Sequence, residues 1–341
     1  MPARITQAIS HLLPASTLNP RQPVASKFIM SQFASQACFL VVITVISKGL
    51  NLGDVAASQV SQGVVTVVSG AFFYFSWKLM EDVPARHVLP EGKSLLTEGF
   101  VQTVKTVKSI NRSYKKGTRW FFLALVFAEA GVNAFTVVAV VFLGEELDLS
   151  FISIGIFFLV SLIFSIPGSL LGAHVTRIMD PKRSWRLSML VLFLWSSIGA
   201  IVLEFLPENL SFLCFLWGAG IGLCLGWFYP TEKLFFSMCL PKGQEAELSG
   251  FYVYSSQILG WLPPLLFSVM VEANVRQTYG VVAVGCFLPL AAGIISCAAP
   301  WPDILEDCGR GLKTEQEVVD VSSNEEYATP SERPLKVEVQ A

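Results

Sequence analysis

Charged residues are scarce in this sequence, and long apolar runs are abundant. Only 15% of the 341 residues are Asp, Glu, Lys or Arg, whereas 53% are hydrophobic and the mean hydropathy is +0.57. This composition excludes an ordinary soluble domain and is typical of an integral membrane protein. The 24 basic and 26 acidic residues nearly cancel, so the sequence gives no sign of a nucleic-acid partner.

Residues that carry enzyme or metal chemistry are also few and scattered. The three histidines lie far apart, no serine occupies a nucleophile elbow, and no glycine-rich phosphate loop follows a strand. The seven cysteines show no paired spacing, and five of them lie inside apolar runs, where they act as small hydrophobic residues. We therefore expect neither an enzyme nor a protein that binds a cofactor or a metal ion.

Eight apolar stretches are long enough to cross about 30 Å of hydrocarbon. They cover roughly residues 28–47, 55–77, 120–143, 150–173, 185–206, 210–238, 247–271 and 277–300. A backbone in lipid must satisfy its own hydrogen bonds, and these stretches do not alternate apolar and polar residues as barrel strands do. Each stretch is therefore predicted to be a helix, and the fold class to be an all-α integral membrane bundle that sits in a lipid bilayer.

The distribution of lysine and arginine predicts the orientation. If both termini lie on one side of the membrane, all but Lys48 and Arg276 of the 24 basic residues lie on that side. Positive residues are retained on the cytosolic side. Both termini are therefore predicted to be cytosolic, and the acidic loop 144–149 is predicted to lie opposite.

Three segments are predicted to lie outside the membrane. Residues 1–26 contain no acid and are predicted to be a disordered leader, with a transit peptide as the alternative. Residues 79–118 form a linker in which apolar residues recur at helical spacing from Leu96 to Val107, as in an amphipathic helix that lies on the cytosolic leaflet. The polar, acidic tail 301–341 is predicted to be disordered.

The order of spans and one motif carry a family resemblance. Two spans in 27–78 precede the linker, and six in 119–300 follow it, which resembles the second half of a major facilitator superfamily transporter. The segment PKGQEAELSGFY at 241–252, followed by GWLPPLLFSVM at 260–270, resembles the signature of the autophagy-related protein 22-like family. This resemblance is specific across 119–300, the carboxy-terminal two-thirds.

The resemblance implies a fold and a function. The superfamily has two six-helix halves, so the first four helices are expected to be missing from this chain or to be supplied by another chain. It implies an effluxer that returns amino acids from the vacuole or lysosome to the cytosol after autophagic breakdown, by alternating access. Leu248, Ser249 and Pro263 depart from the family pattern, so the substrate stays open. The alternative is a truncated, non-transporting membrane protein or a regulatory partner; the alternative location is the plasma membrane.

A carboxylate in the third span is the first candidate for function. Glu129 lies near the middle of 120–143, where a charge costs at least about 2.5 kcal/mol and usually faces a bundle interior or a cavity. Asn133 and Thr136 follow at i+4 and i+7, so the three side chains are predicted to share one helix face. The face is either a path for substrate and protons or a structural acid bonded to Asn133 or to a neighbouring helix.

Polar residues in the seventh span extend this hypothesis. Tyr254, Gln257 and Trp261 share a face of 247–271, and buried side chains of these types need polar partners. They are predicted either to line the same path as Glu129 or to form hydrogen bonds with a neighbouring helix.

Two groups of charged residues are candidates for a cytosolic gate. Glu232 and Lys233 are either a gating ion pair or a lysine that reaches the interface beside a local counter-ion. For Asp180, Lys182 and Arg183 the superfamily resemblance implies a loop that pairs charges between helices and influences opening. The alternative is that these residues only set the topology.

Overall fold

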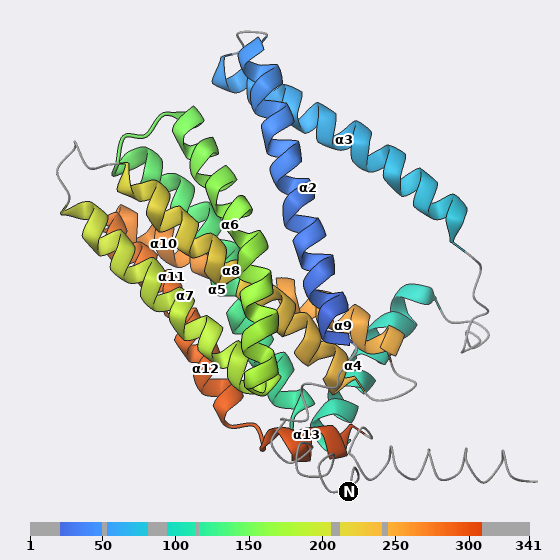
Figure 1. The fold of residues 1–341 in the computed structure, drawn as a ribbon. Helices are drawn as coiled ribbons and strands as arrows, with labels where there is room; N and C mark the ends of the chain where they lie inside the picture. Colours follow the sequence, from blue (N-terminus) through green and yellow to red (C-terminus); the bar gives the residue numbers. More distant parts are fainter. Residues whose placement is uncertain are drawn as a thin grey trace, which may run out of the picture.

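The computed structural model describes residues 21–49, 53–80, 94–113, 116–205, 212–240 and 245–308, and the regular elements in these ranges are all helices (Figure 1). Their bounds are Arg21–Gly49 for α2, Asp54–Leu79 for α3, Leu95–Ser113 for α4, Thr118–Glu145 for α5, Phe151–Ile178 for α6, Pro181–Glu204 for α7, Leu213–Cys239 for α8, Glu245–Gln257 for α9, Leu262–Glu272 for α10, Gln277–Gly285 for α11, Phe287–Ser296 for α12 and Trp301–Asp307 for α13. Within these ranges, seven stretches of helix are long and apolar enough to cross a membrane. The prediction of an all-α membrane bundle is confirmed.

The prediction of one continuous helix over 247–271 is wrong. α9 ends at Gln257, a turn occupies 258–261, and α10 begins at Leu262. Pro263 and Pro264 lie in the first turn of α10, and a proline has no backbone N–H with which to continue a preceding helix. The predicted span 277–300 is matched by a single membrane-spanning stretch, Gln277–Ser296, in which α11 and α12 meet at Cys286.

We call helices α5 to α12 the second bundle. α2 packs along this bundle, whereas α3 extends away from it (Figure 1). Ser26, Ile29 and Phe33 form a buried face of α2, and the Ser26 hydroxyl donates to the backbone oxygen of Ser169 in α6 at 2.9 Å. In contrast, 0% of the most apolar window of α3 is buried. The described chain therefore leaves the surface of α3 uncovered.

The start of α2 corrects part of the prediction for the leader. Residues 1–26 were expected to be disordered, but α2 begins at Arg21. The buried Ser26 contacts α6 and holds the first turns of α2 in place. The rest of the predicted leader, residues 1–20, lies outside the described residues.

Helices α6 and α8 approach each other very closely. The Ser161 and Ser165 hydroxyls of α6 donate to the backbone oxygens of Gly218 and Gly222 in α8, both at 2.9 Å. A Cβ atom on Gly222 would lie 2.1 Å from the backbone oxygen of Ser161, so a larger residue does not fit there. Small residues spaced by four allow such contact between membrane helices.

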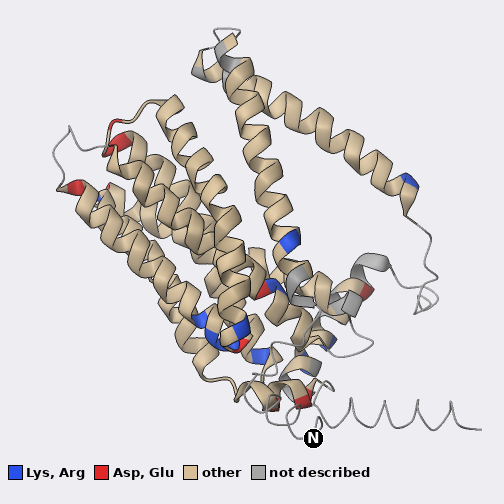
Figure 2. Ribbon diagram, viewed as in Figure 1, with Lys and Arg blue, Asp and Glu red and all other residues tan. Residues whose placement is uncertain are grey.

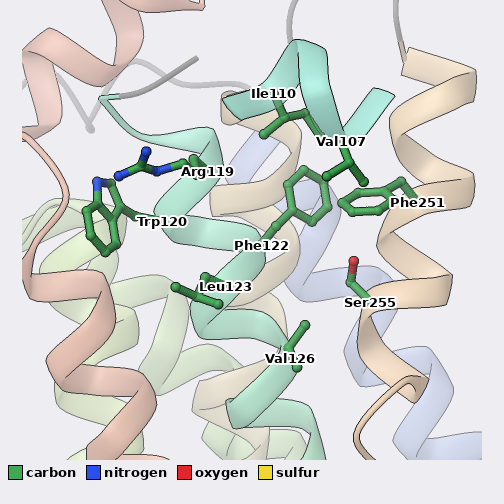
Figure 3. Close-up of a pocket in the computed structure, with 9 residues that line it drawn as sticks. All are labelled: Val107, Ile110, Arg119, Trp120, Phe122, Leu123, Val126, Phe251 and Ser255. Carbon is green, nitrogen blue, oxygen red and sulfur yellow. The ribbon is translucent and has the colours of Figure 1, made fainter. Parts of the chain in front are cut away.

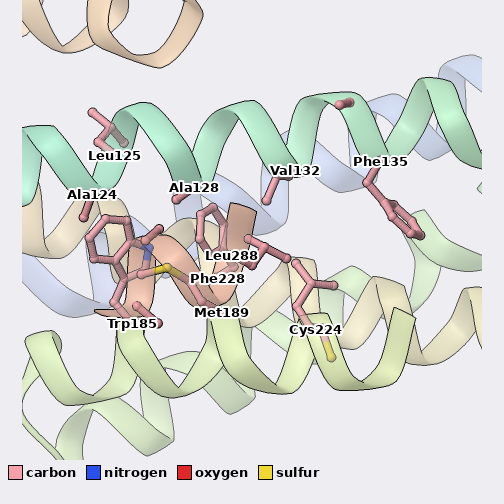
Figure 4. Close-up of a cluster of buried hydrophobic side chains, with 14 of the residues drawn as sticks. Ala124, Leu125, Ala128, Val132, Phe135, Trp185, Met189, Cys224, Phe228 and Leu288 are labelled. Atoms are coloured by element: carbon pink, nitrogen blue, oxygen red, sulfur yellow. The ribbon is translucent and has the colours of Figure 1, made fainter. Parts of the chain in front are cut away.

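The core of the second bundle is aromatic where α5, α7 and α8 meet. Phe121, Trp185 and Phe235 are fully buried, and their ring centroids lie 4.9 to 5.7 Å apart. Figure 4 shows two small side chains of α5, Ala124 and Ala128, on the face that is turned toward Trp185 and Phe228. Because lipid is as apolar as these side chains, close packing holds the helices together in a membrane.

Residues 301–308 correct the prediction of a disordered tail. They contain α13, in which Trp301 and Ile304 are buried. The Trp301 ring lies 5.2 Å from the Phe235 ring, and Ile304 packs on Gly117, where a Cβ atom would approach Ile304 to 2.3 Å. Two apolar residues one turn apart thus anchor a segment whose composition is otherwise polar. Residues 309–341 lie outside the described part of the chain.

Charge is distributed unevenly between the two ends of the second bundle. Figure 2 shows Lys and Arg gathered at the end that carries α13, which we call the basic end, and mainly Asp and Glu at the opposite end. Arg276 lies at the acidic end, where its Nη1 contacts the Glu204 Oε1 at 2.5 Å. The hydrogen bond to Glu204 raises the pKa of the Arg276 guanidinium, so this charge stays paired.

Candidate functional site

Glu129 is buried in α5. The residue is 5% exposed, and its neighbours Ala128 and Ala130 are 0% exposed, so α5 is packed on both sides of the acid. Asn133 Nδ2 donates to Glu129 Oε2 at 3.4 Å, which is long for a hydrogen bond. Burial of a carboxylate is costly unless it is paired and hydrogen-bonded. Asn133 alone therefore does not account for an ionised Glu129.

α8 brings a second acid to Glu129. Glu232 is 0% exposed, and its carboxyl group is close enough to interact with the Glu129 carboxyl group. α5 begins where α8 ends, since the Thr118 hydroxyl donates to the backbone oxygen of Cys239 at 3.2 Å. At 1.5 Å per residue, Glu129 lies about 16 Å and Glu232 about 10 Å from this shared end of the two helices.

Tyr252 of α9 connects the acid pair to Lys233. The Tyr252 hydroxyl donates to Glu232 Oε1, and Lys233 Nζ donates to the Tyr252 hydroxyl oxygen. The Tyr252 ring lies 4.4 Å from the Phe236 ring, which fixes its position. We call Glu129, Asn133, Glu232, Lys233 and Tyr252 the acid cluster.

The acid cluster lacks one hydrogen-bond donor. Among the described residues, no amide, hydroxyl or amine group donates to Oε2 of Glu232. Ionised carboxylates only accept hydrogen bonds, so the contact between Glu129 and Glu232 becomes a hydrogen bond when one of them is protonated. With one shared proton and a charged Lys233, the cluster is electrically neutral, which is the favourable state for buried charges.

Thr136 does not belong to this cluster. It lies two turns beyond Glu129 on α5 and is exposed, although all three predicted residues are close together on the helical wheel. Along this face of α5, other helices bury Glu129, cover Asn133 in part and leave Thr136 exposed. Burial along a single helix face depends on the neighbouring helices, which periodicity does not reveal.

The three predicted residues in the seventh span also lie elsewhere. Tyr254 is 55% exposed, Trp261 is 62% exposed, and Gln257 is exposed as well. α9 turns Tyr252 and Ser255 inward instead, and both are buried. The turn at 258–261 ends α9, so the helical register assumed for Trp261 does not continue.

The predicted gate separates into two groups. Lys182 Nζ donates to the backbone oxygens of Ala298 and Ala299 at 2.6 and 3.0 Å, and thereby ties the start of α7 to the segment between α12 and α13. The other two residues of that group form a surface ion pair, with 3.7 Å between Arg183 Nε and Asp180 Oδ2. In the part of the chain that the structure describes, no hydrogen bond or ion pair joins this group to Glu232 or Lys233.

The sequence analysis missed two tyrosines. Tyr252 is the tyrosine of the Gly-x-Tyr element in the motif at 241–252, so the motif itself could have pointed to it. Tyr229 lies on α8 three residues before Glu232, close enough to interact electrostatically with both carboxyl groups. Its ring lies 6.1 Å from Phe33, so it also contacts α2.

An apolar cavity lies beside the acid cluster, between α4, α5 and α9 (Figure 3). Its volume is about 370 Å³, and it is lined by Val107, Ile110, Arg119, Trp120, Phe122, Leu123, Val126, Phe251 and Ser255. No residue of the acid cluster is among its lining residues. Over the described ranges, no three His, Cys, Asp or Glu residues are grouped so as to hold a metal ion.

Long apolar helices packed into one bundle, with an acid pair at its centre, define the class of multi-pass membrane proteins whose architecture fits solute transport. A comparison with protein families identifies the group within that class. The family described as vacuole effluxer Atg22-like matches residues 11–298, and the chain belongs to this family. No curated protein matches the chain.

Family membership confirms the resemblance found in the sequence and widens it. The resemblance was specific over 119–300, whereas the match also covers α2, α3 and the linker. The family consists of effluxers of the vacuole. A multi-pass, helical protein of the vacuolar membrane with a role in efflux is therefore what the family and the fold together indicate.

Proposed function

We propose that this protein is a secondary active transporter that moves amino acids from the vacuole lumen to the cytosol by alternating access, with the Glu129–Glu232 pair as its proton-binding site. Both termini lie in the cytosol, as the position of the basic end supports. Supply of amino acids after autophagic breakdown is the role that the family resemblance implies.

The buried acid pair is the observation that carries the proposal. A purely structural acid is satisfied by fixed donors, whereas this pair lacks a donor until a proton is present. Binding or release of that proton changes the net charge of a water-excluded cluster by one. A charge change of this kind is a strong bias between two conformations of a membrane protein, and ionisable residues inside membranes mark proton relays and ion pathways.

The position of the pair connects it to parts of the molecule that alternating access must move. Glu129, Glu232 and Tyr252 come from α5, α8 and α9, so the charge of the cluster acts on three helices at once. Tyr229, beside both acids, contacts Phe33 on α2, which precedes the linker. Alternating access is largely a rocking of one bundle against another, and this contact lies between the two.

The test is transport by the purified chain in proteoliposomes, with a mixture of radiolabelled amino acids and with or without a pH gradient. We expect the parent chain to accumulate label when the gradient is applied. In Glu129→Gln, one carboxyl is replaced by a neutral amide of the same shape, so gradient-driven accumulation falls to the level of protein-free liposomes. Exchange of labelled for unlabelled amino acid at equal pH continues, because exchange needs no net proton transfer.

The exposed Glu146 at the other end of α5 provides a matched control, and Glu146→Gln is expected to behave like the parent. If Glu129→Gln transports with an unchanged response to the gradient but unfolds at a lower temperature, Glu129 is a structural acid. If the folded parent moves no amino acid in either assay, the non-transporting alternative holds.

A further inference from the structure

We propose that Tyr252 and Lys233 form a proton relay that connects the buried acid pair to water at the basic end of the bundle. This inference rests on the proposed function and adds the route by which the proton passes between the acid pair and water. Neither residue was predicted for this role: the sequence assigned Lys233 to a gate and gave Tyr252 no role.

The relay is a continuous chain of hydrogen bonds with a gradient of exposure. Lys233 Nζ donates to the Tyr252 hydroxyl, which donates to Glu232, whose carboxyl group meets that of Glu129. The Lys233 side chain is 35% exposed and that of Glu232 is 0% exposed. The relay therefore begins at a group that the described chain leaves partly uncovered and ends at groups that it buries.

The titratable groups around Glu232 are few and come from three helices. Glu129 faces it from α5, Tyr252 from α9, and Lys233 and Tyr229 from α8 itself. Among these groups, Lys233 is the cation and Tyr252 the hydroxyl that bridges it to Glu232. A proton that enters by way of Lys233 therefore reaches Glu232 through the Tyr252 hydroxyl.

The transfer balances as a shift of two protons. Lys233 passes a proton from Nζ to the Tyr252 oxygen while Tyr252 passes its own hydroxyl proton to Glu232 Oε1. An ammonium, a phenol and a carboxylate become a neutral amine, a phenol and a carboxylic acid. Lys233 then takes a proton from water, so the net result is one proton moved from water to the acid pair.

The tyrosine hydroxyl is necessary for this route because the direct gap is too long. Lys233 Nζ lies 3.8 Å from Glu232 Oε1, beyond the range of a hydrogen bond. The Tyr252 ring packs on Phe236, and Lys233 Nζ lies 4.3 Å from the centre of the Tyr252 ring. The Tyr252 hydroxyl is therefore held between Lys233 Nζ and Glu232 Oε1. An ion pair with only a structural role would need no hydroxyl between its two charges.

Tyr252→Phe is the first variant to test, because it removes the hydroxyl and keeps the ring. The assays are gradient-driven accumulation and equal-pH exchange of the same radiolabelled amino acids in proteoliposomes. We expect accumulation to slow by about 100-fold, the lower end of what a positioned proton-transfer group contributes to a rate. Exchange is expected to stay close to that of the parent.

Lys233→Arg distinguishes a relay from an ion pair. Arginine keeps the positive charge and the donor groups but does not give up a proton in proteins. A relay is therefore blocked by Lys233→Arg as fully as by Lys233→Met, whereas an ion pair is preserved by arginine. Lys27 of α2, which is exposed, offers the matched control, and Lys27→Arg is expected to leave both assays unchanged.

The outcomes separate failure of the relay from failure of the proposed function. A parent chain that responds to the gradient, together with an unaffected Tyr252→Phe variant, overturns the relay alone. Normal coupling in Lys233→Arg but not in Lys233→Met also overturns it and leaves an ion pair. A folded parent that exchanges amino acids without any response to the gradient overturns both.

Discussion

At the scale of single residues, the polar side chains inside the spans differ in whether their hydrogen bonds are complete. The acid cluster is buried and lacks a donor until it binds a proton. The Lys182 ammonium group, in contrast, donates hydrogen bonds to two backbone oxygens just after α12. A lysine that is held by two backbone oxygens has little freedom to change partners during a transport cycle. We therefore assign Lys182 to stability and the acid cluster to function.

The first residue-scale prediction concerns Lys182→Met. The variant keeps the approximate length of the side chain and loses both hydrogen bonds to Ala298 and Ala299, so the segment between α12 and α13 is no longer tied to α7. We expect a loss of about 1–2 kcal/mol of unfolding free energy, typical of a hydrogen bond from a charged group that is partly exposed. Thermal unfolding in detergent micelles measures it.

Arg183→Met serves as the comparison for that measurement. The Arg183 side chain is 68% exposed, and its ion pair with Asp180 spans 3.7 Å, so its contribution is about 0–1 kcal/mol. If both variants unfold at the temperature of the parent, the two hydrogen bonds of Lys182 do not stabilise the fold. If both abolish transport without a change in stability, the gate predicted from the sequence is restored.

At the scale of elements, the contact between α6 and α8 fixes the helix that carries two residues of the acid cluster. α8 carries Glu232 and Lys233 on the same helix that packs on α6 through Gly218, Gly222 and Gly226. A Cβ atom on Gly226 would lie 2.1 Å from the backbone oxygen of Ser165. None of these glycines is a site residue, but their close packing sets how far α8 lies from α6.

The prediction at this scale is that Gly222→Ala destabilises the protein. The new methyl group would overlap the Ser161 backbone, and overpacking of a tight contact costs about 1–3 kcal/mol. Gly155→Ala on α6 is the control, since nothing lies within 4 Å of its Cβ position. Alanine in an open helical position gains up to about 1 kcal/mol. Equal unfolding temperatures for the two variants would refute the tight α6–α8 contact.

Charge distribution organises the molecule as a whole. The basic end carries α13 and the start of α5, whereas the acidic end carries the turn after α5 (Figure 2). Basic residues stay on the cytosolic side during membrane insertion. We therefore expect one gradient of charge to set both the orientation of the bundle and the side on which the proposed relay exchanges protons with water.

Accessibility of single cysteines in intact vacuoles tests this orientation. Arg183 and Glu146 are exposed residues at opposite ends of the bundle, so each is replaced by cysteine and treated with a membrane-impermeant maleimide. We expect Arg183→Cys to be labelled at once and Glu146→Cys only after the membrane is permeabilised. The parent chain gives the background from its own cysteines. The reverse pattern would place the termini in the lumen and the relay on the lumenal side.

Particular residues show how far the sequence predicts the site. Glu129 was identified because a carboxylate in an apolar span is costly wherever it lies. Its partner Glu232 was placed in a different group, since the two residues are separated by 103 positions in the sequence. Tyr254 was chosen and Tyr252 missed, because both suit a helix face and only the neighbouring helices decide which face is buried.

The sequence by itself determined the membrane, the helices and the candidate acids, because hydrocarbon imposes the same constraint on every residue of a span. It also carried the family, through the motif at 241–252 and the order of its spans. The tertiary structure alone decided the anchoring of α13 and the meeting of Glu129, Glu232 and Tyr252. These features depend on which helices are neighbours, and that choice is made by close packing between distant segments.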